Sequence, residues 1–218
     1  MNTIIVSDLH IGSKYSRCTE IMDFIGKLPL DCAIVLNGDV MDYFHWNLTK
    51  QQIDTLDLLR KESLKRQIVW IRGNHDKRYV FKNPEKIEFK TSHSIGKRLF
   101  ITHGHDFEKR PLFSYVFVAF FYIFYRLRNL FSKEPMHVAF YAKRYTRLYK
   151  TFRDRVSVNA LKYALNNGYE AVICGHTHYV EECVNNGIRY MNTGSWTEEP
   201  FYYVSVNDKN ISLKIVGN

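Results

Sequence analysis

The sequence predicts an α/β protein in which two mixed β-sheets face each other and helices flank them. Short apolar runs, typical of buried strands, alternate with segments of helical periodicity over residues 3–76. Polar clusters follow the strand-like runs, at the positions where α/β sheets gather functional residues. The C-terminal part alternates strand-like runs with turns at residues 185–187 and 207–208, which predicts the second sheet.

The first part of the chain is expected to form three strands and two helices. The strands are expected over residues 3–7, 32–36 and 67–71, and the helices over residues 17–27 and from the N-cap Thr49 to about Lys65. The residues expected to cover the sheet are Ile21, Phe24, Ile25 and Leu28 from the first helix, and Ile53, Leu56, Leu59 and Leu64 from the second.

The pattern changes after Pro84. Residues 86–90 and 97–102 resemble two shorter strands joined by a turn near Gly96, and residues 170–174 resemble another buried strand. Residues 111 to about 167 have a helical pattern. We therefore expect a single domain over residues 1–218 that carries a helical lid insert at about residues 109–167.

The composition is typical of a globular domain. Hydrophobic residues make up 45% and charged residues 24%, which excludes a disordered chain. The four cysteines have no Cys-x-x-Cys spacing, so we expect reduced thiols at Cys18, Cys32, Cys174 and Cys183. Residues 1–3 lack the basic-then-apolar pattern of a signal peptide, and a cytoplasmic protein is expected.

The net charge of +9 is concentrated in one segment. Residues 109–155 contain 11 Lys and Arg against 2 Asp and Glu, and the rest of the chain carries 20 of each sign. A local surplus of this kind favours a local anionic partner, such as a lipid headgroup, a phosphate substrate or nucleic acid.

Five polar clusters follow predicted strands. They are Asp8 and His10; Gly38, Asp39 and Asp42; Gly73, Asn74, His75 and Asp76; His103 and Gly104; and Gly175, His176, Thr177 and His178. Oxygen and nitrogen donors without a thiolate suit Mn, Fe or Zn better than Ca or a structural zinc.

This set of clusters, in this order, resembles the calcineurin-like metallophosphoesterase superfamily, and the likeness covers about residues 3–216 apart from the insert. The resemblance implies a metallophosphoesterase sandwich with two divalent ions, for which Mn²⁺ is preferred. It assigns one ion to Asp8, His10, Asp39 and His178, and the other to Asn74, His103, His176 and the bridging Asp39.

The resemblance also implies a reaction. A hydroxide that bridges the ions would attack phosphorus in line and hydrolyse a pyrophosphate or phosphodiester bond. His75 would donate a hydrogen bond to the phosphate or leaving oxygen, Asp42 would orient His75, and Asn74 would also contact the substrate.

The insert contains two unusual stretches. Residues 112–125 carry no charge for 14 residues, which is shorter than the roughly 20 that a membrane span needs. We favour a helix that forms an apolar slot or enters the membrane interface, with burial in the core as the alternative.

The second stretch is basic and rich in tyrosine. Tyr141, Tyr145 and Tyr149 are expected on one helical face, and Lys143 and Arg147 lie one turn apart on a neighbouring face. Tyr141, Lys143 and Arg147 are therefore candidate substrate-binding residues, the two cations as a phosphate clamp. The alternative is a solvated basic face packed by tyrosine rings.

An aromatic, basic lid at this place in the chain resembles the UDP-2,3-diacylglucosamine hydrolase branch of the superfamily. The favoured function is therefore hydrolysis of a nucleotide-linked lipid in lipid A biosynthesis, at the inner membrane face and on an anionic membrane surface. A soluble nucleotide phosphodiesterase or nuclease is the second hypothesis, although a nucleic-acid partner is less favoured because nucleases seldom need an apolar slot. The third is a non-catalytic, metal-stabilised scaffold. No obligate protein partner is inferred.

Overall fold

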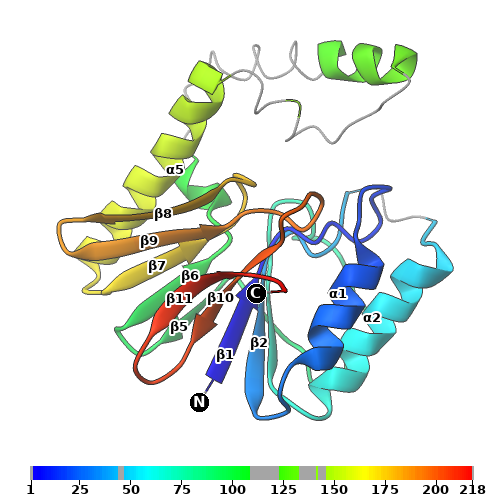
Figure 1. Cartoon of the computed structure of the whole chain (residues 1–218), viewed down its shortest axis with the longest axis horizontal. Coiled ribbons are helices and arrows are strands. Elements are labelled where there is room, and N and C mark those ends of the chain that lie inside the picture. Colours follow the sequence, from blue (N-terminus) through cyan, green and yellow to red (C-terminus); the bar gives the residue numbers. More distant parts are fainter. Residues whose placement is uncertain (1, 44–46, 109–122, 133–140, 142–145, 218) are drawn as a thin grey trace.

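The computed structural model describes residues 2–43, 47–108, 123–132, 141 and 146–217. Within them the chain forms two mixed β-sheets that face each other, with helices on both outer sides (Figure 1). The predicted fold class is confirmed.

The first sheet has the strand order β11-β10-β1-β2-β3-β4. Its strands are β1 (Asn2–Val6), β2 (Cys32–Asn37), β3 (Ile68–Ile71), β4 (Glu88–Lys90), β10 (Tyr202–Val206) and β11 (Ile211–Ile215). Strands β1 to β4 are parallel, whereas β10 and β11 are antiparallel to their neighbours. The parallel strands therefore end at the same edge of the sheet, where the first three polar clusters begin.

The second sheet has the strand order β5-β6-β7-β9-β8. Its strands are β5 (Ser92–Ile95), β6 (Leu99–Thr102), β7 (Ala171–Cys174), β8 (Val180–Asn185) and β9 (Ile188–Thr193). Strands β6, β7 and β9 run parallel to one another, so the clusters that follow β6 and β7 also meet at one edge.

Side chains that alternate along the strands divide the core into layers. On β1, Ile5 points toward the second sheet, while Ile4 and Val6 pack under the helices α1 (Cys18–Lys27) and α2 (Lys50–Ser63). Val172 and Cys174 of β7 pack under α5 (Thr146–Asn166) on the opposite side of the molecule. These strands are covered on both faces, and this explains why their sequences are continuous hydrophobic runs.

Helix α2 begins after the expected N-cap residue, but the face that it buries differs from the prediction. The Thr49 hydroxyl accepts a hydrogen bond from Gln52 N, and the Gln52 side chain accepts one from Thr49 N, which forms a capping box. Leu56 and Leu59 are buried as expected. The inward placement of Ile53 and Leu64 was wrong: they are 47% and 55% exposed, because Gln52, Thr55 and Glu62 occupy the buried face instead.

The two strands expected over residues 86–90 and 97–102 are present as β4 and β6, and a turn at Gly96 precedes β6, but the two strands are not joined as a hairpin. Strand β4 belongs to the first sheet, and β6 pairs instead with β5, which the prediction missed. Ile95 is the one aliphatic residue among Ser92, His93, Ser94 and Ile95, and all four are at least partly exposed at the sheet edge. A strand of this kind has almost no hydrophobic pattern to recognise.

Only parts of the insert lie within the described residues. Residues 123–131 are helical, α5 follows from Thr146, and most of the charge-free stretch of residues 112–125 lies outside. Among the described helices, none combines the length and the apolar character needed to cross a bilayer. The division into one domain with a lid at about residues 109–167 stays a prediction.

Candidate metal centre

The five clusters predicted from the sequence converge at one edge of the two-sheet sandwich. Loops after β1, β2 and β3 of the first sheet meet loops after β6 and β7 of the second. Three groups of His and Asp side chains there have ligand atoms within 4.8 Å of one another and could hold a metal ion. The groups are Asp8, His10 and His178; Asp39, His103 and His176; and His10, Asp39 and His75.

The first group brings together residues 170 positions apart in the chain. His178 Nε2 lies 3.1 Å from Asp8 Oδ1 and also 3.1 Å from His10 Nε2. All three side chains are at most 7% exposed. A carboxylate oxygen and two imidazole nitrogens pointing at one place are a donor set suited to a divalent transition metal.

The second group is centred on Asp39. Asp39 Oδ2 lies 3.2 Å from His103 Nε2, and His103 Nδ1 donates to the Asn37 carbonyl at 2.9 Å, which fixes the imidazole ring. Asn74 Oδ1 is buried and has no hydrogen-bond partner among the described residues. An unsatisfied buried carbonyl oxygen is costly in a folded protein, and a cation would satisfy it.

Asp39 is shared by two of the groups, the one with His103 and His176 and the one with His10 and His75. It therefore lies between the histidines that the sequence resemblance assigns to different ions. This is the position that a bridging carboxylate of a two-metal site occupies.

The backbone at these side chains adopts a conformation that L-residues rarely use. Five residues of the centre have positive φ: Asp8 (57°), His10 (48°), Asp39 (50°), His176 (66°) and His178 (54°). Each such residue is disfavoured by about 1–3 kcal/mol and persists only where its surroundings fix it. Here Asp8 N donates to Gly38 O at 3.0 Å, and His10 N donates to Asp39 O at 2.9 Å. The strain is thus concentrated at the candidate ligands, as at functional sites in general.

Two glycines allow the loops to approach closely. A Cβ atom on Gly73 would lie 2.1 Å from Asp39 Oδ1, and one on Gly175 would lie 2.4 Å from Asp8 Oδ2. Any larger residue would displace a carboxylate, so glycine is required at both positions.

The electrostatic field of the centre favours cations. Burial alone would lower the pKa of His103, but the carboxylates of Asp39 and Asp8 raise it to about 10. Burial raises the pKa of Asp8 itself to about 6, and its proximity to Asp39 contributes. A divalent ion would neutralise the same two carboxylates, so the residues present fit the metals that the sequence implies.

His75 lies at the open side of the centre and is 21% exposed. Its Nδ1 forms a 2.9 Å hydrogen bond with Asp42 Oδ1, and its Nε2 lies 3.8 Å from Asp39 Oδ2. The ring of Tyr43, which is 49% exposed, stacks on His75 with 3.9 Å between the ring centroids. The structure therefore brings together His75 and Asp42, and it adds an aromatic side chain that the sequence analysis did not consider.

Two other residues of the site, Glu108 and Tyr149, were missed, and Asp76 was placed in a polar cluster but given no role. Asp76 accepts hydrogen bonds from Val40 N, Gly73 N and Trp70 Nε1 at 2.7–3.0 Å, and so it joins the loops after β2 and β3. Glu108 contacts His176, and Tyr149 donates a hydrogen bond to the Thr177 carbonyl. The position of Asp76 directly after His75 had placed it in the cluster, but nothing in the spacing of Glu108 or Tyr149 indicated a contact.

Only some of the predicted substrate-binding residues of the lid lie among the described residues. Lys143 lies outside the described residues, and of Arg147 only its place in the first turn of α5 is described. Tyr141 packs against Tyr125, with 5.8 Å between ring centroids, and the Arg128 guanidinium lies over its ring. The substrate-binding role of these residues stays a prediction.

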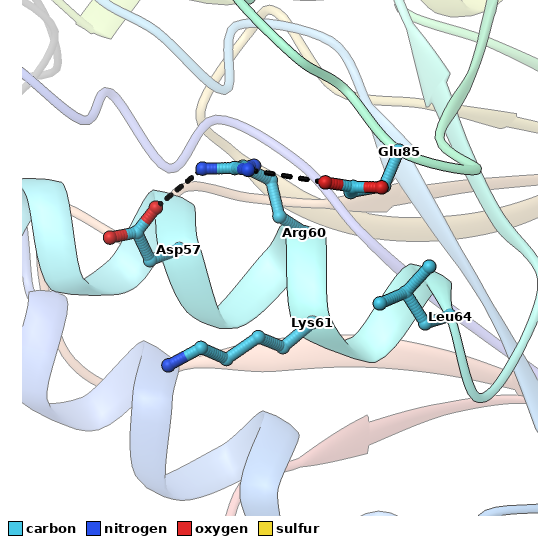
Figure 2. A pocket seen from close by; sticks show the side chains of 5 residues that line it. All are labelled: Asp57, Arg60, Lys61, Leu64 and Glu85. Carbon is cyan, nitrogen blue, oxygen red and sulfur yellow. Dashed lines mark hydrogen bonds and ion pairs between the residues drawn. The ribbon is translucent and has the colours of Figure 1, made fainter.

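A shallow hollow of about 190 Å³ lies at the C-terminal half of α2 (Figure 2). Arg60 donates to Asp57 at 3.0 Å and to Glu85 at 3.2 Å, so three of the charged residues that line it pair with one another. None of its lining residues belongs to the metal-ligating groups, and it is not the candidate site.

The fold and the site define a class of protein: a layered α/β sandwich with a His/Asp metal centre on the loops that follow its strands. A family model described as calcineurin-like phosphoesterase matches residues 1–180. The chain belongs to the calcineurin-like phosphoesterase family, whose enzymes are hydrolases that use divalent metal ions.

The comparison with solved structures gave matches at low sequence identity. A novel archaeal phosphodiesterase aligns with a TM-score of 0.50 and 15% identity, over 99% of this chain and 100% of its own. YfcE, a phosphoesterase from E. coli, aligns with a TM-score of 0.49 and 17% identity, over 100% of this chain and 97% of its own. Vps29 from Cryptosporidium parvum aligns with a TM-score of 0.49 and 12% identity, over 98% and 95%. A search of curated proteins gave no match.

Gly73→Ala tests the close approach at Asp39. The added Cβ would push on Asp39 Oδ1 and on Asp39 N, so we expect a loss of about 1–3 kcal/mol in the free energy of unfolding and weaker Mn²⁺ binding. Gly26→Ala is the control, because no atom lies within 4 Å of its Cβ, and on the exposed side of α1 it should stabilise by about 0.5–1 kcal/mol. Urea unfolding and calorimetric Mn²⁺ titration measure both effects. A Gly73→Ala protein that unfolds and binds Mn²⁺ like the wild type would contradict the close approach.

Proposed function

We propose that the protein is a two-metal phosphohydrolase that cleaves a pyrophosphate or phosphodiester bond, with Mn²⁺ as the preferred ion. The observation that carries this proposal is the position of Asp39 between two sets of histidines. One ion would be held by Asp8, His10, Asp39 and His178, and the other by Asp39, Asn74, His103 and His176. When bound there, the two ions would neutralise phosphoryl oxygens and make a coordinated water more acidic.

His75 would act on the substrate directly, and Asp42 would act through His75. Burial opposes a charge on His75, but its hydrogen bond to Asp42 and the nearby Asp39 carboxylate raise its pKa. Asp42 accepts from Nδ1 and so orients the ring. In the protonated ring, which the raised pKa favours, Nε2 also carries a proton that it can donate to a phosphoryl or leaving oxygen. Removal of such a donor reduces the rate by about 10²–10⁴-fold.

A nucleotide-linked lipid such as UDP-2,3-diacylglucosamine is the substrate that the described part of the insert favours. Along the helix of residues 123–131, five apolar side chains are 48–82% exposed and fall at helical spacing on one face: Ile123, Phe124, Leu127, Leu130 and Phe131. Tyr125, on the opposite face, packs against Tyr141.

An exposed apolar face of this kind is typical of helices that lie in a membrane interface. Arg126 and Arg128 flank it and would attract anionic headgroups. This supports a cytoplasmic protein that associates peripherally with the inner membrane face, near its lipid substrate.

A soluble nucleotide phosphodiesterase is the second candidate. The exposed Tyr43 ring against His75 favours it, because an aromatic side chain beside the reacting centre can stack a nucleobase. Both candidates need the same metal centre, and they differ in whether the insert contacts a lipid.

Hydrolysis should depend on the histidines of the centre. With Mn²⁺, the protein should hydrolyse an aryl phosphodiester, and His178→Ala should reduce turnover by at least about 100-fold through loss of a ligand. His93→Ala, in the edge strand β5, should keep wild-type turnover. A panel with UDP-2,3-diacylglucosamine and with cyclic and linear nucleotides separates the two candidates. Metal binding without turnover of any substrate would favour the non-catalytic scaffold.

Membrane association should depend on the apolar face of the 123–131 helix. A Leu127→Glu/Leu130→Glu variant should bind phosphatidylglycerol vesicles at least about tenfold more weakly, since burying one leucine contributes roughly 1.5–3 kcal/mol. Its hydrolysis of a soluble aryl phosphodiester should be unchanged. The control is Leu30→Glu/Val80→Glu, which changes two apolar side chains elsewhere that are at least as exposed. Equal vesicle binding of the two variants in a sedimentation assay would refute the membrane role of this helix.

A further inference from the structure

Glu108 is the last described residue before the insert, and its carboxylate is directed at the metal centre. Its Oε2 lies 2.8 Å from His176 Nε2, and the two side chains are only 8% and 11% exposed. A hydrogen bond in such a shielded position is stronger than one at the protein surface. The contact joins the N-terminal stem of the insert to a candidate ligand.

The contact also determines which imidazole nitrogen faces the metal centre. An imidazole that binds a metal ion through one nitrogen is neutral and has a single N–H, on its other nitrogen. An ionised carboxylate can only accept a hydrogen bond, so Nε2 carries that proton. The lone pair then lies on Nδ1, which becomes the nitrogen available to a metal ion.

The C-terminal stem of the insert contacts the same loop. Tyr149, in the first turns of α5, donates a hydrogen bond to the Thr177 carbonyl, between His176 and His178. The ring of Phe152 meets the His176 ring edge-on, with 5.6 Å between centroids. The Arg153 guanidinium lies over the ring of Tyr179, which follows His178.

We propose that Glu108 and Tyr149 are positioning residues that hold the His176–His178 loop from the two stems of the insert. Glu108 sets the tautomer and orientation of His176, and Tyr149 fixes the loop backbone beside it. The insert is therefore tied to the ion that His176 would hold, in addition to any contact it makes with substrate. This inference rests on the proposed two-metal function.

Calorimetric titration of the full-length protein with Mn²⁺ tests the role of Glu108. Glu108→Ala should raise the Kd of one of the two Mn²⁺ ions by about 10–100-fold, the usual effect of losing such a partner of a ligand, and should leave the other Kd unchanged. Glu108→Gln should have a smaller effect, because its amide oxygen can still accept from His176 Nε2. Glu88→Ala is the control, as it removes an exposed carboxylate that pairs with Lys90.

Tyr149→Phe tests the second stem with a single-atom change. It should weaken the same Mn²⁺ site, whereas Tyr169→Phe, which removes a hydroxyl bonded to Ser94 away from the centre, should not. Circular dichroism melting verifies that each variant is folded.

The titrations distinguish failure of the positioning role from failure of the two-metal function. A wild-type Kd at both ions in Glu108→Ala, or equal weakening of both ions, would overturn the positioning role while leaving the two-metal function intact. If the wild-type protein binds no Mn²⁺, the proposed function fails, and this inference fails with it.

Discussion

The burial of two carboxylates beside each other is the constraint on which the rest of the structure depends. Asp8 and Asp39 are at most 1% exposed. Burial and the neighbouring Asp39 raise the pKa of Asp8, whereas burial is outweighed at Asp39, where His103 and other histidines hold the pKa well below its ordinary value. Such a pair is stable only if positive charge compensates it, which the raised pKa of His103 reflects. Divalent cations would also compensate the negative charge of the two carboxylates, and this is why the centre is interpreted as a candidate metal site.

Residues 192–196 contribute no candidate ligand, but their hydrogen bonds connect the two sheets beside this centre. Ser7 Oγ and Thr193 Oγ1 form a 2.6 Å hydrogen bond, and Trp196 N donates to Asp8 O at 3.1 Å. Asn192 Nδ2 donates to Gly175 O at 2.6 Å. The C-terminal end of β9 and the residues just after it therefore anchor the Asp8 loop of one sheet and the His176 loop of the other, and they keep the strained backbone of both in place.

The sequence was informative where chemistry requires particular residues at strand ends. The five polar clusters and the fold class could be predicted because buried parallel strands are continuous apolar runs and their loops share one edge. Strand β5 was missed because its residues are polar and partly exposed. Ile53 and Leu64 were misplaced because helical periodicity does not show that Gln52 and Glu62 are buried. Glu108 and Tyr149 act through tertiary contacts, which spacing along the chain does not encode.

The most direct test of the two-metal centre is anomalous X-ray diffraction from crystals grown with Mn²⁺. The account predicts two Mn²⁺ peaks, one beside Asp8, His10 and His178 and one beside Asn74, His103 and His176, with Asp39 coordinating both. A single peak, or an Asp39 carboxylate that coordinates only one of two ions, would contradict the central claim.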